Sequence, residues 1–228
     1  MNNFRLWRYS RVLFSQKWPA MLLISLFINL VVFFNFIYRY LKLHYSVIQI
    51  LGELSASSRL LFFMVPTLLI LIAILPEMRV IDLLNYKGRN SEIVYHGIKF
   101  IFSVSIVFVP LFSQYCLYLL FDVASFVYFG PTVLFQLEFF LIIWLFYFVL
   151  LQLLKNKVIA FIFTYLLVFL DYFVLFSKFK MSLFWDKSAA LFWNQQTIEL
   201  VSQFYLLGII VLLCGVLLLV IYRKDYLS

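Results

Sequence analysis

The chain has 228 residues, of which 66% are hydrophobic and 12% are charged, and its formal net charge is +8. A soluble domain typically has about 45–50% apolar and about 25% charged residues, so a single soluble core could not bury this much apolar surface. The expected solvent is lipid, the expected class is an integral membrane protein, and no nucleic-acid partner is expected.

The apolar residues are grouped into stretches long enough to cross a bilayer. One crossing helix needs roughly 20 mostly apolar residues, and six such helices with short loops use the whole chain, 1–228. The expected fold is therefore all-α: one domain, a polytopic membrane protein with six transmembrane helices. The spans are expected at 20–41, 60–76, 98–121, 132–154, 158–177 and 202–222.

Prolines mark several of the expected helix ends. Pro19 is expected to open the first span, Pro76 to end the second, and Pro131 to open the fourth, because proline lacks the N–H that a helix interior uses. Pro66 and Pro110 fall inside expected spans, which membrane helices tolerate when neighbouring groups satisfy the freed carbonyls.

The distribution of Lys and Arg predicts the orientation. Cytoplasmic loops of membrane proteins carry an excess of these residues. If both termini are cytoplasmic, 12 of the 18 basic residues lie inside, which is the favoured arrangement. The inner ones are then Arg5, Arg8, Arg11, Lys17, Arg79, Lys87, Arg89, Lys99, Lys155, Lys157, Arg223 and Lys224.

Residues 1–19 precede the first span and form a basic amphipathic segment. Arg5, Arg8 and Arg11 share one side of a helical wheel, and the opposite side is apolar, with Leu6, Trp7, Leu13 and Phe14. This pattern predicts an interfacial helix lying in the headgroup layer. A basic topology signal without a fixed helix is the alternative.

The longest expected inner loop, 77–99, is also patterned, with a short helical segment expected at 77–91. Met78, Ile81 and Leu84 share a face, and Gly88 follows as a usual helix stop. The pattern predicts a short amphipathic helix on the cytoplasmic side between the second and third spans. A simple re-entry turn is the alternative.

The last expected outer loop, 178–199, mixes Trp185 and Trp193 with charged residues. A fully solvated loop would not carry so many large apolar side chains. Short re-entrant helices that dip into the interface before the last span are the expected structure.

No sequence pattern indicates catalysis in this chain. It has no nucleotide-binding P-loop, no GxSxG and no HExxH, and His44 and His96 have no partners at metal-ligand spacing. We expect no catalytic residue, no metal site and no cofactor in the chain itself.

Two acids fall inside expected spans, Glu138 in the fourth and Asp171 in the fifth. Intramembrane acids are costly and are functional candidates by default. Both lie roughly 10 Å below the same surface at about 1.5 Å per residue, on helices joined by only three residues. They are candidates for a translocation pathway through a water-filled cavity. The alternative is that each acid hydrogen-bonds to a neighbouring helix and stabilises the bundle.

The whole layout resembles the six-span permease subunits of type-2 ABC exporters. The resemblance covers the whole chain through its architecture. Three parts carry it: the basic amphipathic helix Phe4–Trp18, the segment between spans two and three with Lys87-Gly88-Arg89-Asn90-Ser91, and the Trp-rich segment Ser182–Gln196.

The resemblance implies roles for these parts. The first would be an elbow helix, the second a coupling helix that docks on a separate ATPase subunit, and the third a pair of re-entrant helices. ATP and Mg would be bound by a pair of cytoplasmic ATPase subunits working with two permease copies or homologues in a bacterial plasma membrane. The substrate would be a peptide, bacteriocin or antibiotic. The expected ATPase contacts are Asp82, Tyr86, Lys87, Arg89 and Asn90.

Two other readings compete with a transporter subunit. One is a non-transporting membrane partner, such as an immunity protein or an assembly factor. The other is an intramembrane enzyme, against which the missing catalytic motifs weigh.

The orientation generates a testable prediction. Reporter fusions after Gly88, Asn156 and Ser228 should report the cytoplasm, and fusions after Gly52, Phe126 and Lys187 should report the outside, because of the bias in basic residues. An outside signal at Gly88 would overturn both the orientation and the expected ATPase contact.

Overall fold

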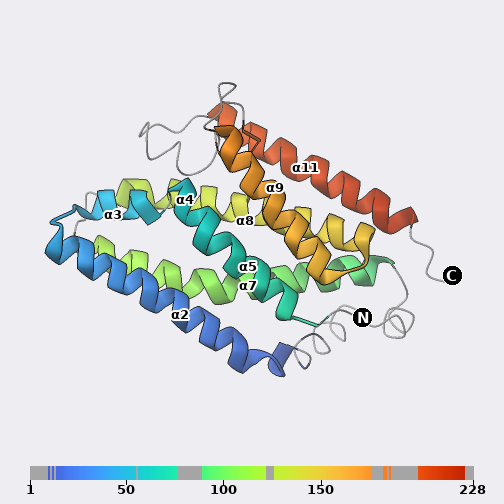
Figure 1. Cartoon of the computed structure of the whole chain (residues 1–228), viewed down its shortest axis with the longest axis horizontal. Coiled ribbons are helices and arrows are strands. Elements are labelled where there is room, and N and C mark those ends of the chain that lie inside the picture. The colour runs from blue at the N-terminus through green and yellow to red at the C-terminus, as the bar shows by residue number, and fades with distance from the viewer. Residues whose placement is uncertain are drawn as a thin grey trace.

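Every element of regular structure in the described residues is helical (Figure 1). The computed structural model describes residues 10, 12, 14–54, 56–76, 89–121, 126–175, 182–183, 185 and 200–223. The elements are α2 (Trp18–Ile37), η1 (Tyr38–Lys42), α3 (Val47–Leu54), α4 (Ser57–Arg59), η2 (Leu60–Met64), α5 (Val65–Ile74), α7 (Arg89–Leu119), α8 (Phe126–Leu154), α9 (Lys157–Leu175) and α11 (Leu200–Arg223).

Four helices are long and apolar enough to cross a membrane. They correspond to the expected spans at 20–41, 132–154, 158–177 and 202–222. Their bounds are Trp18–Lys42, Val133–Leu154, Lys157–Val174 and Phe204–Arg223.

The other two expected spans have a different form. The stretch expected at 60–76 is a shorter apolar helix, Leu60–Ile74, which begins with the π-helical turn η2 and continues as α5. The stretch expected at 98–121 lies within α7, which has 31 residues. At about 1.5 Å per residue α7 is roughly 46 Å long, more than the roughly 30 Å hydrocarbon core of a bilayer.

The prolines follow the expected pattern with one exception. Pro19 lies in the first turn of α2, and Pro76 follows α5, where Leu75 is already extended with ψ at 137°. The prediction for Pro131 is wrong, because α8 begins at Phe126 and already contains Pro131. Only the first four N–H groups of a helix lack an intrahelical acceptor, so Pro131, the sixth residue, removes one helical hydrogen bond.

Helix α8 is the central element of the bundle. In an apolar window of 18 residues within α8, 61% of the residues are buried, against 28% in the corresponding window of Trp18–Lys42 and 22% in those of the other two helices. It packs on α9 and on α11, while α2 runs beside α7 (Figure 1). The α2–α7 contact includes a buried hydrogen bond of 2.8 Å from Ser25 Oγ to the Ile106 carbonyl.

The outer helices expose large apolar side chains that water would not stabilise. Phe34 is 63% exposed on α2, and Phe204 and Val211 are each 71% exposed on α11. Lipid or another apolar protein surface is the compatible environment for such faces. This exposure fits the composition, which provides more apolar surface than one bundle can bury.

The connection between α8 and α9 is fixed by local chemistry. Lys155 has a positive φ of 53°, as a residue directly after a helix often does. The Asn156 Oδ1 accepts hydrogen bonds from the N–H groups of Val158 and Ile159, at 3.0 and 3.2 Å. This is an N-cap, so the two helices are joined by a tight turn and pack as neighbours.

The chain between the first two apolar helices contains structure that was not predicted. Helix α2 continues as the π-helical turn η1, and α3 and α4 follow before η2 begins. Val47 and Ile50 of α3 are buried. Both π-helical segments of the described residues therefore flank this one connection.

The N-terminal segment 1–19 is described only at Ser10, Val12 and from Phe14 onward. Phe14 is 2% exposed, and its ring lies 5.0 Å from that of Phe102 and 5.9 Å from that of Tyr95, both on α7. The end of this segment therefore packs on α7.

Candidate functional site

The two intramembrane acids lie on neighbouring helices, Glu138 on α8 and Asp171 on α9. Each is 8% exposed. Both have partners within the chain. Their burial places them among packed helices and away from the lipid-facing surface.

Asp171 holds a piece of the segment that was expected to be re-entrant. The backbone N–H of Leu183 donates a hydrogen bond of 2.7 Å to Asp171 Oδ1. Three residues earlier on α9, the Val168 carbonyl accepts a hydrogen bond of 3.1 Å from Trp185 Nε1. Residues 183 and 185 are thus tied to one face of α9, and the rest of 178–199, apart from Ser182, lies outside the described residues.

Trp185 connects α9 to α8 through aromatic contacts. It is 1% exposed, and its ring centroid lies 4.8 Å from Phe139 and 5.8 Å from Tyr172. Phe139 follows Glu138 in the chain, and Tyr172 follows Asp171. The residues that directly follow the two acids therefore contact the same indole ring.

The arrangement bears on the two roles predicted for the acids. The Asp171 carboxylate is an acceptor for backbone, and in a membrane an unsatisfied backbone N–H would cost several kcal/mol. This gives Asp171 a structural contact that sequence reasoning missed, because the partner is a main-chain group twelve residues away. Whether the acids also line a translocation pathway stays a prediction.

A second cluster of polar contacts lies where α5 ends. Tyr95 Oη, on α7, donates a hydrogen bond of 2.7 Å to the Pro76 carbonyl, and Lys157 Nζ, on α9, donates one of 3.1 Å to the Leu75 carbonyl. The last carbonyls of a helix have no intrahelical partner. Here side chains from α7 and α9 donate hydrogen bonds to the two main-chain carbonyls just beyond α5.

The first turns of α7 add a buried polar row to this cluster. Glu92, His96 and Lys99 are 3%, 4% and 0% exposed, and spacings of four and three residues place them on one face. Gln152 Nε2 of α8 donates a hydrogen bond of 2.9 Å to Glu92 Oε1, and the His96 ring lies 3.7 Å from that of Phe148. The spacing of Glu92, His96 and Lys99 in the sequence is a local signal from which this polar face could be predicted.

The predicted ATPase contacts are described only in part. Asp82, Tyr86 and Lys87 lie outside the described residues. Arg89 and Asn90 are the first two residues of α7, directly before the polar row. Among the residues that the structure describes, no three His, Cys, Asp or Glu side chains form a group that could hold a metal ion.

Comparison with known proteins finds no matching family model, no similar curated protein and no similar solved structure.

The contact between Tyr95 and Pro76 generates a stability prediction. Tyr95→Phe keeps the buried ring and removes only the hydroxyl donor, so we expect a loss of about 1 kcal/mol in the free energy of unfolding. The measurement is thermal unfolding of the purified chain in detergent. Tyr165→Phe, a partly buried residue on α9, is the matched control and should leave the transition unchanged; equal effects of the two variants would contradict the role given to Tyr95.

The contact between Asp171 and Leu183 generates a second stability prediction. Asp171→Leu leaves the Leu183 N–H without its acceptor, so we expect destabilisation by about 1–3 kcal/mol. Asp171→Asn keeps an acceptor oxygen and should retain most of the stability. Thermal unfolding in detergent gives the comparison.

The same variants separate the two roles of the acids. If Asp171→Asn and Glu138→Gln unfold like the wild type and lower transport or resistance, the charge acts in a pathway. If Asp171→Leu is as stable as the wild type, the carboxylate does not hold the 182–185 segment.

Proposed function

We propose that this chain is the membrane-spanning permease subunit of an ATP-driven ABC exporter in a bacterial plasma membrane, with both termini in the cytoplasm. Its six spans would be the four long apolar helices together with Leu60–Ile74 and the later part of α7. The ATPase, with its ATP and Mg, would be a separate cytoplasmic subunit pair. A second copy or homologue of this chain would complete the transporter.

The observation that carries this proposal is the anchoring of both ends of the segment 77–88. Before it, the Leu75 and Pro76 carbonyls are held by Lys157 and Tyr95. After it, Glu92 is hydrogen-bonded to Gln152 of α8. A force applied to this segment would reach α5, α7, α8 and α9 through hydrogen bonds and buried side chains. A coupling helix needs such a stiff connection, whereas a simple re-entry turn does not.

The length of α7 supports the same reading. A helix of 31 residues exceeds the hydrocarbon core by about 16 Å, so part of it would project from the bilayer. The polar residues are concentrated in its first eleven positions, which include Arg89, Glu92 and Lys99. Its beginning would therefore project toward the cytoplasm, where an ATPase subunit could contact Arg89 and Asn90.

The exported substrate would be a peptide, a bacteriocin or an antibiotic. This part of the proposal comes from the resemblance to small exporters with separate subunits. Glu138 and Asp171 would contact a cationic group of the substrate or share a proton between them.

A non-transporting membrane partner, such as an immunity protein or an assembly factor, is the second candidate. The burial of Trp185 beside Phe139 and Tyr172 favours it, because these rings fill space near the two acids. Under this reading the acids would only stabilise the bundle.

A binding experiment distinguishes the two candidates. The full chain is purified from its native membranes in mild detergent, and Mg-dependent ATP hydrolysis of the co-purified material is measured. We expect hydrolysis with the wild type and a loss of about tenfold or more with Asp82→Ala combined with Arg89→Ala, because removing interfacial charges costs about 2–5 kcal/mol.

The control is a substitution on the other side of the membrane, Lys42→Ala, which should keep the ATPase. Membrane insertion of every variant is checked by the yield in the membrane fraction. If no ATPase co-purifies with the wild-type chain, the non-transporting candidate is favoured. If the variant with Asp82→Ala and Arg89→Ala co-purifies with as much ATPase as the wild type, the segment 77–91 is only a turn.

A further inference from the structure

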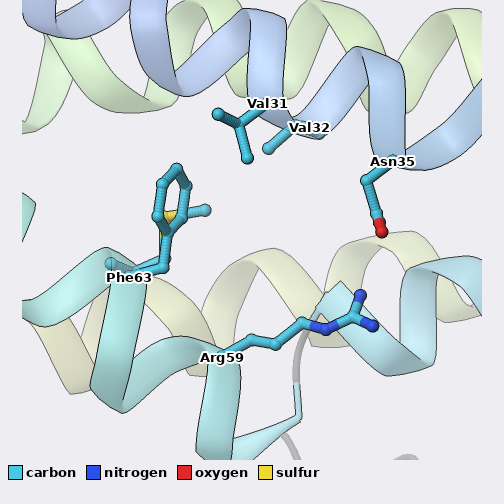
Figure 2. A pocket seen from close by; sticks show the side chains of 6 residues that line it. Val31, Val32, Asn35, Arg59 and Phe63 are labelled. Atoms are coloured by element: carbon cyan, nitrogen blue, oxygen red, sulfur yellow. The ribbon is translucent and has the colours of Figure 1, made fainter.

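A cavity of about 270 Å³ lies between α2 and the start of the second apolar helix (Figure 2). Its walls are apolar toward the middle of α2 and polar toward the end of α2. The lining residues are Val31, Val32, Asn35, Arg59, Phe63 and Met64.

In the proposed membrane arrangement the polar end of the cavity would lie at headgroup depth. Trp18 begins α2, and Asn35 is 17 residues further on, about 26 Å along the helix axis. This distance approaches the roughly 30 Å thickness of the hydrocarbon core. Tyr38, Arg39 and Lys42 follow directly in η1, and an aromatic and basic belt is typical of the membrane interface.

The side-chain amide of Asn35 has a donor group whose hydrogen-bonding capacity is not used within the described residues. Arg39 Nε donates a hydrogen bond of 3.0 Å to Asn35 Oδ1, which fixes the orientation of the amide because an arginine cannot accept. The Asn35 Nδ2 is buried and has no hydrogen-bond partner among the described residues. A buried amide donor of this kind normally has an acceptor.

Two guanidinium groups accompany this donor. The side chain of Arg59 extends along the cavity toward Asn35 (Figure 2). Arg39 is held in place by Asn35 and by the ring of Tyr45, 5.4 Å from its guanidinium carbon. Burial and the neighbouring Arg39 lower the pKa of Arg59 below its ordinary value, and Tyr45 acts in the opposite direction.

We propose that this cavity binds the phosphate of an anionic membrane phospholipid, with Asn35 Nδ2 and Arg59 as donors and the apolar wall against the acyl chains. Guanidinium groups suit phosphate because they present several donors in a planar fork. Val31, Val32, Phe63 and Met64 would meet the beginning of the acyl chains. Both arginines have other contacts in the chain, so the phosphate would join an existing network.

The backbone geometry of the cavity supports a binding role. Phe63 and Met64 belong to η2, and η1 begins three residues after Asn35. π-helical turns are rare and frequently occur at functional sites. Here η2 contributes two apolar residues to the cavity wall, and η1 places Arg39 beside Asn35.

The test is a lipid titration of the purified full-length protein in detergent, followed by native mass spectrometry. Phosphatidylglycerol is the probe, and inorganic phosphate is titrated separately and as a competitor. Asn35→Asp keeps the acceptor for Arg39 and replaces the free donor with a negative charge. Arg59→Gln removes one charge from the cavity wall.

Lys42→Gln is the matched control. It removes the same charge at the same end of the bundle, but Lys42 lies over the Tyr38 ring, 5.7 Å from its centroid, and does not line the cavity. We expect Asn35→Asp and Arg59→Gln each to weaken phosphatidylglycerol binding about tenfold, and Lys42→Gln to weaken it less than about twofold.

Three results would overturn the proposal. The first is wild-type affinity in both cavity variants, and the second is an equal loss in Lys42→Gln, which would indicate a general effect of charge. The third is competition by inorganic phosphate at the same concentration as the lipid, which would assign the cavity to a soluble anion. Thermal unfolding without lipid shows whether each variant is folded, and Arg59→Lys, which keeps the charge, should retain more binding than Arg59→Gln. The titration needs no transport activity, so its outcome is independent of the proposed function.

Discussion

The requirement that backbone polar groups be satisfied without water governs this structure. In the hydrocarbon region an unsatisfied N–H or C=O costs several kcal/mol, and only helices satisfy most of theirs internally. At the ends of a helix, however, the first N–H groups and the last C=O groups have no intrahelical partner. Asn156 caps the start of α9, and Lys157 and Tyr95 donate hydrogen bonds to the carbonyls after α5. Asp171 accepts a hydrogen bond from the N–H of Leu183. Polar side chains in a largely apolar chain thus bind main-chain groups that helical hydrogen bonds leave unsatisfied.

These contacts give the described parts of the bundle two different polar regions. One combines the end of α5, the start of α7 and the α8–α9 turn, and it contains the buried Glu92, His96 and Lys99. The other combines Asp171, Glu138 and Trp185 with aromatic packing across α8 and α9. Because α8 and α9 run through both regions, a displacement at one of them would reach the other along packed helices. The proposed transport function would require such a connection.

The helices differ in how much of their apolar surface is exposed. Helix α8 is mostly buried, whereas α2, α9 and α11 leave large apolar side chains uncovered. Helix α2 has two surfaces of different character: one packs on α7 through Ser25, and another forms the cavity wall with Val31 and Asn35. A single helix therefore contributes both to the packed interior of the bundle and to the cavity for which we propose a lipid ligand.

The amino-acid sequence by itself determined the class of the protein, the helical fold and the bounds of four apolar helices to within a few residues. Hydrophobicity over about 20 residues is a local property, and so is the tight Lys155–Asn156 turn. No such local signal indicates the start of α8 before Pro131, the π-helical turns or α3. Only the tertiary structure decided that Asp171 binds the backbone of Leu183, that Lys157 reaches Leu75, and that Asn35 and Arg59 meet in one cavity. These contacts join residues 12, 82 and 24 positions apart, and no local pattern of polarity specifies which distant main-chain group will need a partner.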